Sequence, residues 1–550
     1  MSVEAPDGRP AVAGFAIVLA GAILTFFFLI VAIAEAGWLV RVPIHAMVLP
    51  LAFAGSCLTT AWGGRAYFRH SLQVALAVGA ILALLVVASA RISLTFYDVS
   101  FDGQAYQQEG VYQLAHGWNP LFTPYIGPIS VEQDAKLIHY PKGPWIIAAA
   151  MYRLTGHIES GKFANVPLIV AAFLLALAAF ARWEKKLSAW SASVALLVAA
   201  SPVALCQVLT FYVDGQMASL LACLAALCCL SITDGGPWVD LMMFEAAVLL
   251  ILLKFTGLVY VIMIFAGFFL LLLCQKRPGR QFALVAFLAL GLGTFVFGKN
   301  PYVMNTFENG NPFYPFLGRG DFPIITMDAT TPPEFQGVNR AIDLVASISS
   351  RSTSWPPEST LKAPWQVERS EWDAFEEPDV LTGGFGPLFP AALALSLAIL
   401  AIGVWRGGIR PRLACAAILI MIGSVLPVSA CWWARYAPQV WLVPLVALVP
   451  CVDVGAKKTL RWASWLVVLI LAVNVGGIAR VNFRANLNAT HDVAESLEDL
   501  RSHSPFKVTL GLFHSNRFRL QEAGIPFTQV NGHLRCDPQV EENDDLCIQQ

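Results

Sequence analysis

Long apolar runs separated by short polar linkers dominate the chain between residues 11 and 480. Most of them approach or reach the roughly 20 residues that an α-helix needs to cross a bilayer. The weakest pair is separated only by Lys254, Phe255 and Thr256, and its first run is short. The pattern predicts about thirteen transmembrane helices, at 11–34, 43–61, 71–94, 163–181, 189–206, 214–231, 239–253, 255–274, 282–298, 386–405, 413–428, 435–451 and 462–480.

Basic residues mark one side of this array. With thirteen spans and a cytoplasmic N-terminus, the Lys and Arg clusters of the short linkers all fall on the cytoplasmic side, as the positive-inside rule requires. The same assignment places 95–162, 299–385 and the tail 481–550 on the extracytoplasmic face. Since these are the long polar segments, we expect the function to lie there.

The pattern also divides the chain. We expect a transmembrane hairpin in 1–70, a membrane module in 71–298, an outer loop in 299–385, further transmembrane helices in 386–480 and a small α/β tail in 481–550. The tail pattern predicts helices around 492–501 and 516–523 and strands at 507–512 and 527–530. A disulfide between Cys536 and Cys547 is expected only if the tail faces an oxidising compartment.

Composition supports this class. The 550 residues are 57% hydrophobic and only 13% charged, with a mean hydropathy of +0.62, which is too apolar for a water-soluble chain of this length. The sequence therefore predicts an all-α polytopic membrane protein with membrane lipids as neighbours. A net charge of -1 gives no reason to invoke nucleic acid.

The first outer loop, 95–162, directly follows an apolar run and contains many polar and charged residues. If its start is helical, Asp98, Asp102, Glu109 and His116 fall on one face, because each residue advances about 100°. A solvated helix on the membrane surface would explain the same pattern. The loop ends in HYPKGPW, where two prolines flank Lys142 just before the chain re-enters the membrane.

Two more charges emerge on the same side. Asp214, in FYVDG, begins a span, and an ionised carboxylate at that position is costly unless it has a function. Helix capping is the alternative role. Arg435 follows two tryptophans in CWWARYAPQ, where a membrane-interface anchor is the commoner use. Together, these carboxylates and cations suit a base for a hydroxyl and partners for a lipid phosphate.

The arrangement resembles the GT-C superfamily of polyprenyl-phosphate-dependent glycosyltransferases, in particular the protein O-mannosyltransferase and aminoarabinose transferase type. The similarity covers about 71–480 and rests on an acidic first outer loop, a second acid in the next outer turn, a Lys-x-Pro element and a long outer loop after the ninth span. In that superfamily the acidic loop follows the first span, whereas here it follows the third. An extra hairpin at 11–61 accounts for the difference.

The resemblance implies a glycosyltransferase of the bacterial cytoplasmic membrane, with its site and C-terminus outside. Its donor would be a polyprenyl-phosphate sugar and its acceptor a hydroxyl of a glycan, lipid or protein. Residue by residue, it assigns catalysis to Asp102 and Asp214 and donor-phosphate binding to Lys142 and, more loosely, Arg435. Phosphate is a good leaving group, so Asp102 as base would give a single displacement with inversion. We expect the remaining substrate contacts from Asp98, Glu109, His139 and Tyr140.

Several alternatives remain open. Asp98 or Glu109 could replace Asp102 as base, and the two catalytic acids could share a divalent cation, although two loop carboxylates define no coordination sphere. A lipid-linked substrate transporter or flippase would carry ionisable residues near the bilayer midplane. The spans are nearly free of charge apart from Lys254, which favours surface chemistry. A polysaccharide polymerase or ligase using His116 or His139 is a second rival, and a non-enzymatic assembly or receptor protein is a third.

Overall fold

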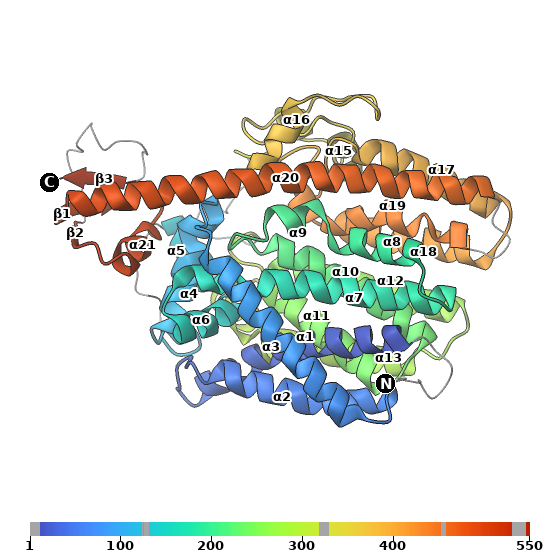
Figure 1. The fold of residues 1–550 in the computed structure, drawn as a ribbon, viewed down its shortest axis with the longest axis horizontal. Coiled ribbons are helices and arrows are strands. Elements are labelled where there is room, and N and C mark those ends of the chain that lie inside the picture. Colours follow the sequence, from blue (N-terminus) through green and yellow to red (C-terminus); the bar gives the residue numbers. More distant parts are fainter. Residues whose placement is uncertain are drawn as a thin grey trace.

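The computed structural model describes residues 11–123, 125, 131–317, 329–452, 458–530 and 546–549. Helices dominate these residues and pack into one bundle, from which the C-terminal unit projects at one end (Figure 1). The expectation of a mainly helical chain with a small α/β tail is confirmed. The Cys536–Cys547 pairing lies outside the described side chains.

The first half of the chain supplies the helices α1 (Ala11–Leu39), α2 (Val48–Gly63), α3 (Ser71–Leu94), α4 (Gln108–Ala115), α5 (Val131–His139), α6 (Gly143–Thr155), α7 (Asn165–Glu184), α8 (Ala189–Ala199), α9 (Pro202–Cys206), α10 (Asp214–Thr233), α11 (Pro237–Leu253), α12 (Phe255–Cys274), α13 (Arg280–Gly291) and α14 (Met304–Asn309). The second half supplies α15 (Arg340–Ile348), α16 (Ser370–Asp373), α17 (Phe389–Trp405), α18 (Ile409–Val425), α19 (Leu442–Val446), α20 (Lys458–Ser502), α21 (Asn516–Glu522), β1 (Phe506–Leu510), β2 (Phe527–Gln529) and β3 (Leu546–Gln549).

Six described helices are long and apolar enough to cross a membrane, and a bent pair that includes α13 would make a seventh. Other expected spans lie on shorter helices, such as α2 with 16 residues and α11 with 17. The count of thirteen is therefore not confirmed and stays a prediction. The uncertain pair around Lys254 does form two helices, because Lys254 is extended, with φ of -161° and ψ of 154°.

Prolines explain two places where an expected span is not one regular helix. The run 189–206 is divided into α8 and α9 at Pro202, since proline cannot donate a helical hydrogen bond and disfavours helix in the residue before it. The run 435–451 contains Pro438, Pro444 and Pro450 and forms only short helical segments, among them α19. Both were expected as continuous spans.

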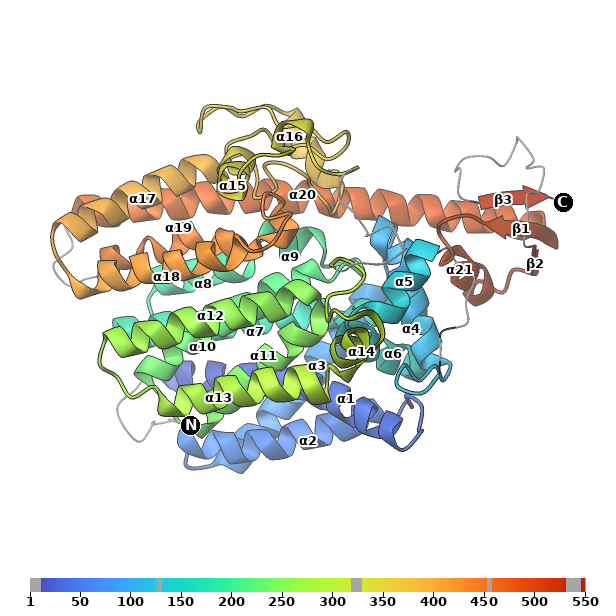
Figure 2. The ribbon, with the colours of Figure 1, turned by 180° about the vertical axis from the view of Figure 1, so that it is seen from behind.

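The N-terminal helix α1 lies inside the bundle. It packs against α2, α7 and α11, and most of its apolar side chains are buried. Helix α1 is thus part of the packed core, whereas α2 packs against it and exposes Leu51, Leu58 and Trp62 on its other face. Figure 2, from behind, shows α13 alongside α12, and the two helices pack against each other.

The last expected span and the first expected tail helix are one continuous helix. No proline interrupts 462–501, so α20 extends over 45 residues, about 68 Å at 1.5 Å per residue. It runs along the bundle and beyond it to a three-stranded sheet of order β2-β1-β3 (Figure 1). Strand β1 pairs in parallel with β2 and antiparallel with β3, and α21 connects β1 to β2.

Several charged residues inside the expected spans were overlooked in the sequence, among them Arg91, Asp240 and Glu245. Glu245 lies within α11, is fully buried, and accepts a hydrogen bond from the Thr25 hydroxyl of α1 at 2.9 Å. The description of the spans as nearly charge-free apart from Lys254 was therefore wrong. The apolar residues around Glu245 in α11 hide it in the average hydropathy.

Close packing around Trp238 predicts a selective loss of stability. A Cβ atom at Gly63 would lie 2.2 Å from the Trp238 ring, whereas one at Gly423 meets nothing within 4 Å. We expect Gly63→Ala to cost about 1–3 kcal/mol through overpacking. Gly423→Ala should leave stability unchanged or slightly raised, because Ala is the better helix former. Thermal unfolding of the detergent-solubilised protein measures both, and equal midpoints would contradict this account of the packing.

Candidate active site

Five charged side chains from distant parts of the chain meet at one end of the bundle. The Arg435 guanidinium is the centre: its Nε donates to Asp214 at 2.7 Å, its Nη1 to Asp379 at 2.6 Å and its Nη2 to Asp102 at 2.8 Å. Lys254 Nζ donates to the other oxygen of Asp214 at 2.7 Å. Three carboxylates and two cations thus form one ionic network, the Arg435 cluster.

The ends of several elements bring this cluster together. Asp102 precedes a π-helical turn, η2 (Gly103–Gln107), and Asp214 is the first residue of α10. Lys254 occupies the break between α11 and α12, and Arg435 lies in a short helical turn, η8 (Ala434–Tyr436). Asp379 lies in the segment between α16 and α17. Irregular backbone at helix ends is what allows five charges to converge.

Aromatic rings cover the cations. Arg435 Cζ lies 4.3 Å from the Tyr212 ring centroid, and Lys254 Nζ lies 3.8 Å from that of Tyr436. Cation–π attraction is strengthened when water is excluded. The Tyr212 hydroxyl also donates to Asp379 at 3.2 Å. These rings hold the two cations in place without neutralising them.

The three carboxylates differ in exposure and in how many of their oxygens are bonded to a cation. Asp214 is only 1% exposed, and both of its oxygens are taken by Arg435 and Lys254. Asp102 and Asp379 keep 16% and 20% of their side-chain exposure, and one oxygen of each is bonded to Arg435. Asp379 Oδ1 is buried with no hydrogen-bond partner among the described residues. Asp102 and Asp379 are therefore the carboxylates with capacity to accept a proton.

Burial raises the pKa of Asp379 to about 6 despite the lowering effect of Arg435, and the nearby Asp102 and Asp214 raise it further. A pKa near neutrality suits a group that exchanges protons in the physiological range.

Both Asp-Gly pairs have a steric explanation. The Asp98 carboxylate lies so close to the following turn that a Cβ at Gly103 would be 2.0 Å from Asp98 Oδ2. At the second pair, the Gly215 N–H donates to Gln207 at 2.7 Å, and a Cβ would be 3.1 Å from the Gln207 side chain. Each glycine therefore lets a polar side chain pack tightly behind the turn that carries Asp102 or Asp214.

The single-face arrangement expected for the first loop was wrong. Asp98 precedes the helix, and the π turn η2 shifts the register of the residues that follow it. As a result, Asp102 contacts Arg435, whereas Glu109 accepts hydrogen bonds from Arg517 at 2.6 Å. His116 is exposed and stacks on Tyr112, with ring centroids 3.8 Å apart.

The other expected substrate-binding residues contact protein groups in this structure. Asp98 accepts from the Ser100 and Phe211 N–H groups at 2.9 and 2.7 Å. His139 Nδ1 lies 2.7 Å from Asn305 Oδ1, and Tyr140 packs against the rings of Tyr106, Phe255 and Phe316. None of these contacts joins them to the Arg435 cluster, and substrate binding by them stays a prediction.

Lys142 is held by three protein acceptors. Its Nζ donates to the carbonyls of Ile138 and Tyr140, each at 2.9 Å, and to Asn300 Oδ1 at 2.6 Å. Burial lowers the pKa of Lys142 to about 7. Since an ammonium group has three N–H donors, all are occupied here, and the expected phosphate contact would require exchanging one of them.

Sequence reasoning missed Asp379 and discounted Lys254. Lys254 did carry a signal, because a lone charge between two apolar runs is costly unless it is paired. Asp379 follows two glutamates in a loop of mixed composition, and nothing in its local sequence distinguishes it. Its role depends on the distant Arg435, a contact that local patterns do not reveal.

The described residues contain no group of three or more His, Cys, Asp and Glu side chains arranged to hold a metal ion. The three aspartates are instead joined through Arg435. A divalent cation shared by Asp102 and Asp214 would have to displace that guanidinium.

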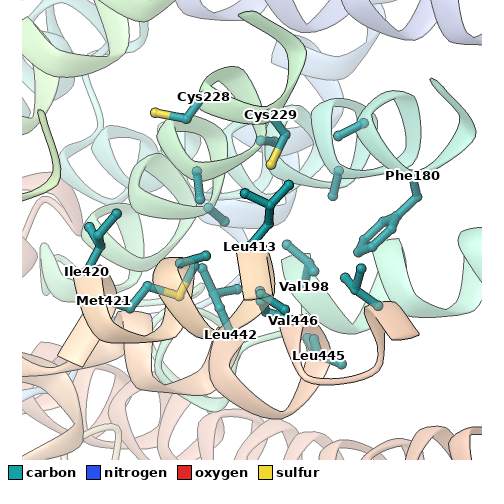
Figure 3. Close-up of a pocket in the computed structure, with 18 of the residues that line it drawn as sticks. Phe180, Val198, Cys228, Cys229, Leu413, Ile420, Met421, Leu442, Leu445 and Val446 are labelled. Carbon is teal, nitrogen blue, oxygen red and sulfur yellow. The ribbon is translucent and has the colours of Figure 1, made fainter. Parts of the chain in front are cut away.

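A second feature is an apolar cavity of about 190 Å³ inside the bundle (Figure 3). Side chains of α7, α8, α10, α18 and α19 line it, including Phe180, Val198, Cys228, Leu413 and Leu442. Its lining begins at Leu221, seven residues and about 10 Å along α10 from Asp214. The cavity is smaller than typical pockets for whole ligands, about 300–1,000 Å³, so it suits part of an apolar chain.

Comparison with protein families and with curated protein sequences gives no match. Among solved structures, the chain is similar to the crystal structure of ArnT from Cupriavidus metallidurans bound to undecaprenyl phosphate. The two share 12% sequence identity with a TM-score of 0.42, over 83% of this chain and 86% of ArnT.

The raised pKa of Asp379 predicts a pH effect on stability. Because this pKa lies above the ordinary value near 4, between about pH 4 and pH 6 the folded protein holds a proton that the unfolded chain has lost. Lowering the pH through 6 should therefore stabilise the wild type relative to Asp379→Asn. Thermal midpoints of both proteins from pH 7.5 to pH 5 test this, and parallel pH curves would contradict it.

Proposed function

We propose that this chain is a membrane glycosyltransferase that moves a sugar from a polyprenyl-phosphate donor to an acceptor hydroxyl at the extracytoplasmic face of a bacterial cytoplasmic membrane. The observation that carries the proposal is the Arg435 cluster: two cations and three carboxylates at one end of an apolar helical bundle. Such a cluster combines groups that bind phosphate with groups that accept a proton.

The cations would bind the donor phosphate. Arg435 keeps one further N–H on each of Nη1 and Nη2, because each of these nitrogens makes one of the ion pairs described above. Lys254 also has donors beyond its bond to Asp214. We therefore place Lys254 beside Arg435 as a phosphate-binding residue. Lys142, whose three donors are occupied, would bind phosphate only after exchanging one of them. The apolar cavity would take part of the lipid chain.

Transfer would be a single displacement. Asp102 accepts the proton of the acceptor hydroxyl while that oxygen attacks the anomeric carbon. The bond from the anomeric carbon to the phosphate oxygen breaks, and its electron pair leaves with the polyprenyl phosphate. Attack from the face opposite the leaving group inverts the anomeric centre. Arg435 and Lys254 offset the charge that develops on the phosphate.

Asp214 would act through the cations. Since both of its oxygens are occupied, it cannot accept the hydroxyl proton without breaking an ion pair. Instead, it fixes Arg435 and Lys254 relative to each other. Asp379 is the second candidate base, because one of its oxygens has no partner and its pKa lies near 6.

A transporter or flippase for a lipid-linked substrate is the second candidate function. Glu245 favours it, because a carboxyl group buried within a membrane helix often marks a substrate or proton pathway. The Arg435 cluster favours the transferase, since it lies at the end of the bundle, where an acceptor in water can reach it.

The decisive test is release of free polyprenyl phosphate from a panel of polyprenyl-phosphate sugars, with crude envelope acceptors and purified protein. Removing a general base typically costs 10²–10⁴ in rate, so we expect Asp102→Asn to lower the release by roughly that factor. Asp492→Asn, an exposed change on α20, is the control and should match the wild type.

Three results would change the assignment. If Asp379→Asn loses the activity and Asp102→Asn keeps it, Asp379 is the base, and the acid limb of the wild-type pH profile should lie near pH 6. Equal release by all variants would refute both assignments. No release from any donor would refute the transferase and favour transport, which flipping of labelled lipid in proteoliposomes would then measure.

A further inference from the structure

The C-terminal unit contacts the outer loop that carries Asp102. Three charged residues of α21 make these contacts: Arg517 pairs with Glu109 at 2.6 Å, Arg519 donates to Gln104 at 3.0 Å, and Glu522 accepts from the Ile158 N–H at 2.7 Å. Ile158 begins the short turn η3 (Ile158–Ala164), which closes the same loop. A segment more than 350 residues away in the sequence thus holds both ends of this loop.

Asp98, four residues before Asp102, is fixed from every side. Its N–H donates to Glu159 at 3.1 Å, and its carboxylate accepts the two backbone N–H groups described above. Its carbonyl oxygen accepts a short hydrogen bond from Arg519 Nη2. Among these partners, only Arg519 comes from the C-terminal unit.

Arg519 therefore holds the turn on both sides of Asp102. One end of its guanidinium contacts Asp98 and the other contacts Gln104, so its two bonds span residues 98–104. Asp102 lies between these two anchors and contacts Arg435 instead. A shift of Arg519 would displace the turn as a unit and move the Asp102 carboxylate relative to the Arg435 guanidinium.

These contacts, which bury charged side chains, are an inefficient way to attach the C-terminal unit to the bundle. Arg519 and Glu109 are 7% and 1% exposed, and the desolvation of such groups offsets most of the attraction that they gain. Apolar contacts would attach the unit at lower cost. Directional bonds from a planar guanidinium instead define position, which is the property that a carboxylate acting as a base requires.

We propose that α21 is a positioning element of the candidate active site, in which Arg519 fixes the turn 98–104 and so sets where Asp102 meets Arg435. This inference rests on the proposed function. It adds that the C-terminal unit controls turnover without touching the substrate.

The test uses the full-length protein with Arg519→Gln and Arg519→Lys. Arg501→Gln is the matched control, because Arg501 is exposed and contacts Glu498 and the Ala523 carbonyl but makes no described contact to the outer loop. Hydrogen–deuterium exchange of the 98–110 amides needs no substrate. We expect it to be about tenfold faster in Arg519→Gln, to change less in Arg519→Lys, and to equal the wild type in Arg501→Gln.

The kinetic measurement uses the donor identified by the release assay. A misplacement of about 1 Å can cost about 10²-fold in rate, so kcat should fall by roughly that factor in Arg519→Gln while KM stays within about threefold. Arg519→Lys, which keeps the charge and one of the two bonds, should recover part of kcat.

Different results would refute the positioning role of Arg519 and the proposed transferase function. Unchanged exchange at 98–110 in Arg519→Gln, or a kcat equal to that of Arg501→Gln, would overturn the positioning role even if the wild type is a transferase. Faster exchange in β1 and β2 together with 98–110 would also overturn it, because the variant would then have lost the unit as a whole. Wild-type protein that releases no polyprenyl phosphate would refute the proposed function, whatever the exchange shows.

Discussion

The buried guanidinium of Arg435 is the constraint on which this end of the helical bundle depends. An unpaired cation in this position would be strongly destabilising, so the chain has to bring carboxylates to it. Asp102, Asp214 and Asp379 come from three separate segments, and each segment must end at the same place for the charge to be balanced. The starts of η2 and α10 place Asp102 and Asp214 at this point, and the break at Lys254 brings a second cation to Asp214.

Local sequence patterns predicted the helices and strands, because these depend mainly on neighbouring residues. Apolar runs marked the helices, and the alternation and turn residues after Arg501 marked β1, α21 and β2 close to their observed bounds. Two of the three aspartates and Arg435 were also identified, because a charge at the end of an apolar run stands out in the sequence. That these groups contact one another is a property of the fold, and the sequence could only suggest that they share a side.

The remaining differences come from interactions over long sequence distances. Asp379 was missed because its partner Arg435 is 56 residues away. Glu109 and Asp98, for which substrate binding stays a prediction, contact Arg517 and the Phe211 N–H in this structure, and local sequence does not reveal either partner. The π turn at 103–107 breaks the helical periodicity that placed four residues on one face. Prolines divided two expected spans, although their positions were visible in the sequence.

The length of α20 has a mechanical consequence. Its 22 residues from 481 to 502 extend the helix about 33 Å past its apolar part. Asn482 donates to the Phe375 carbonyl and Thr490 accepts from the Tyr97 N–H, so about 18 Å of helix lie beyond the second of these contacts. A tilt of about 5° would move the far end of that part by about 1.6 Å, which exceeds the tolerance of a hydrogen bond. Since the tilt of a membrane helix is set by its packing on neighbouring helices, changes where α20 packs on α8, α9 and α17 would act on the Arg519 contacts. Residues of α20 far from Asp102 would thereby be coupled to the position of that carboxylate.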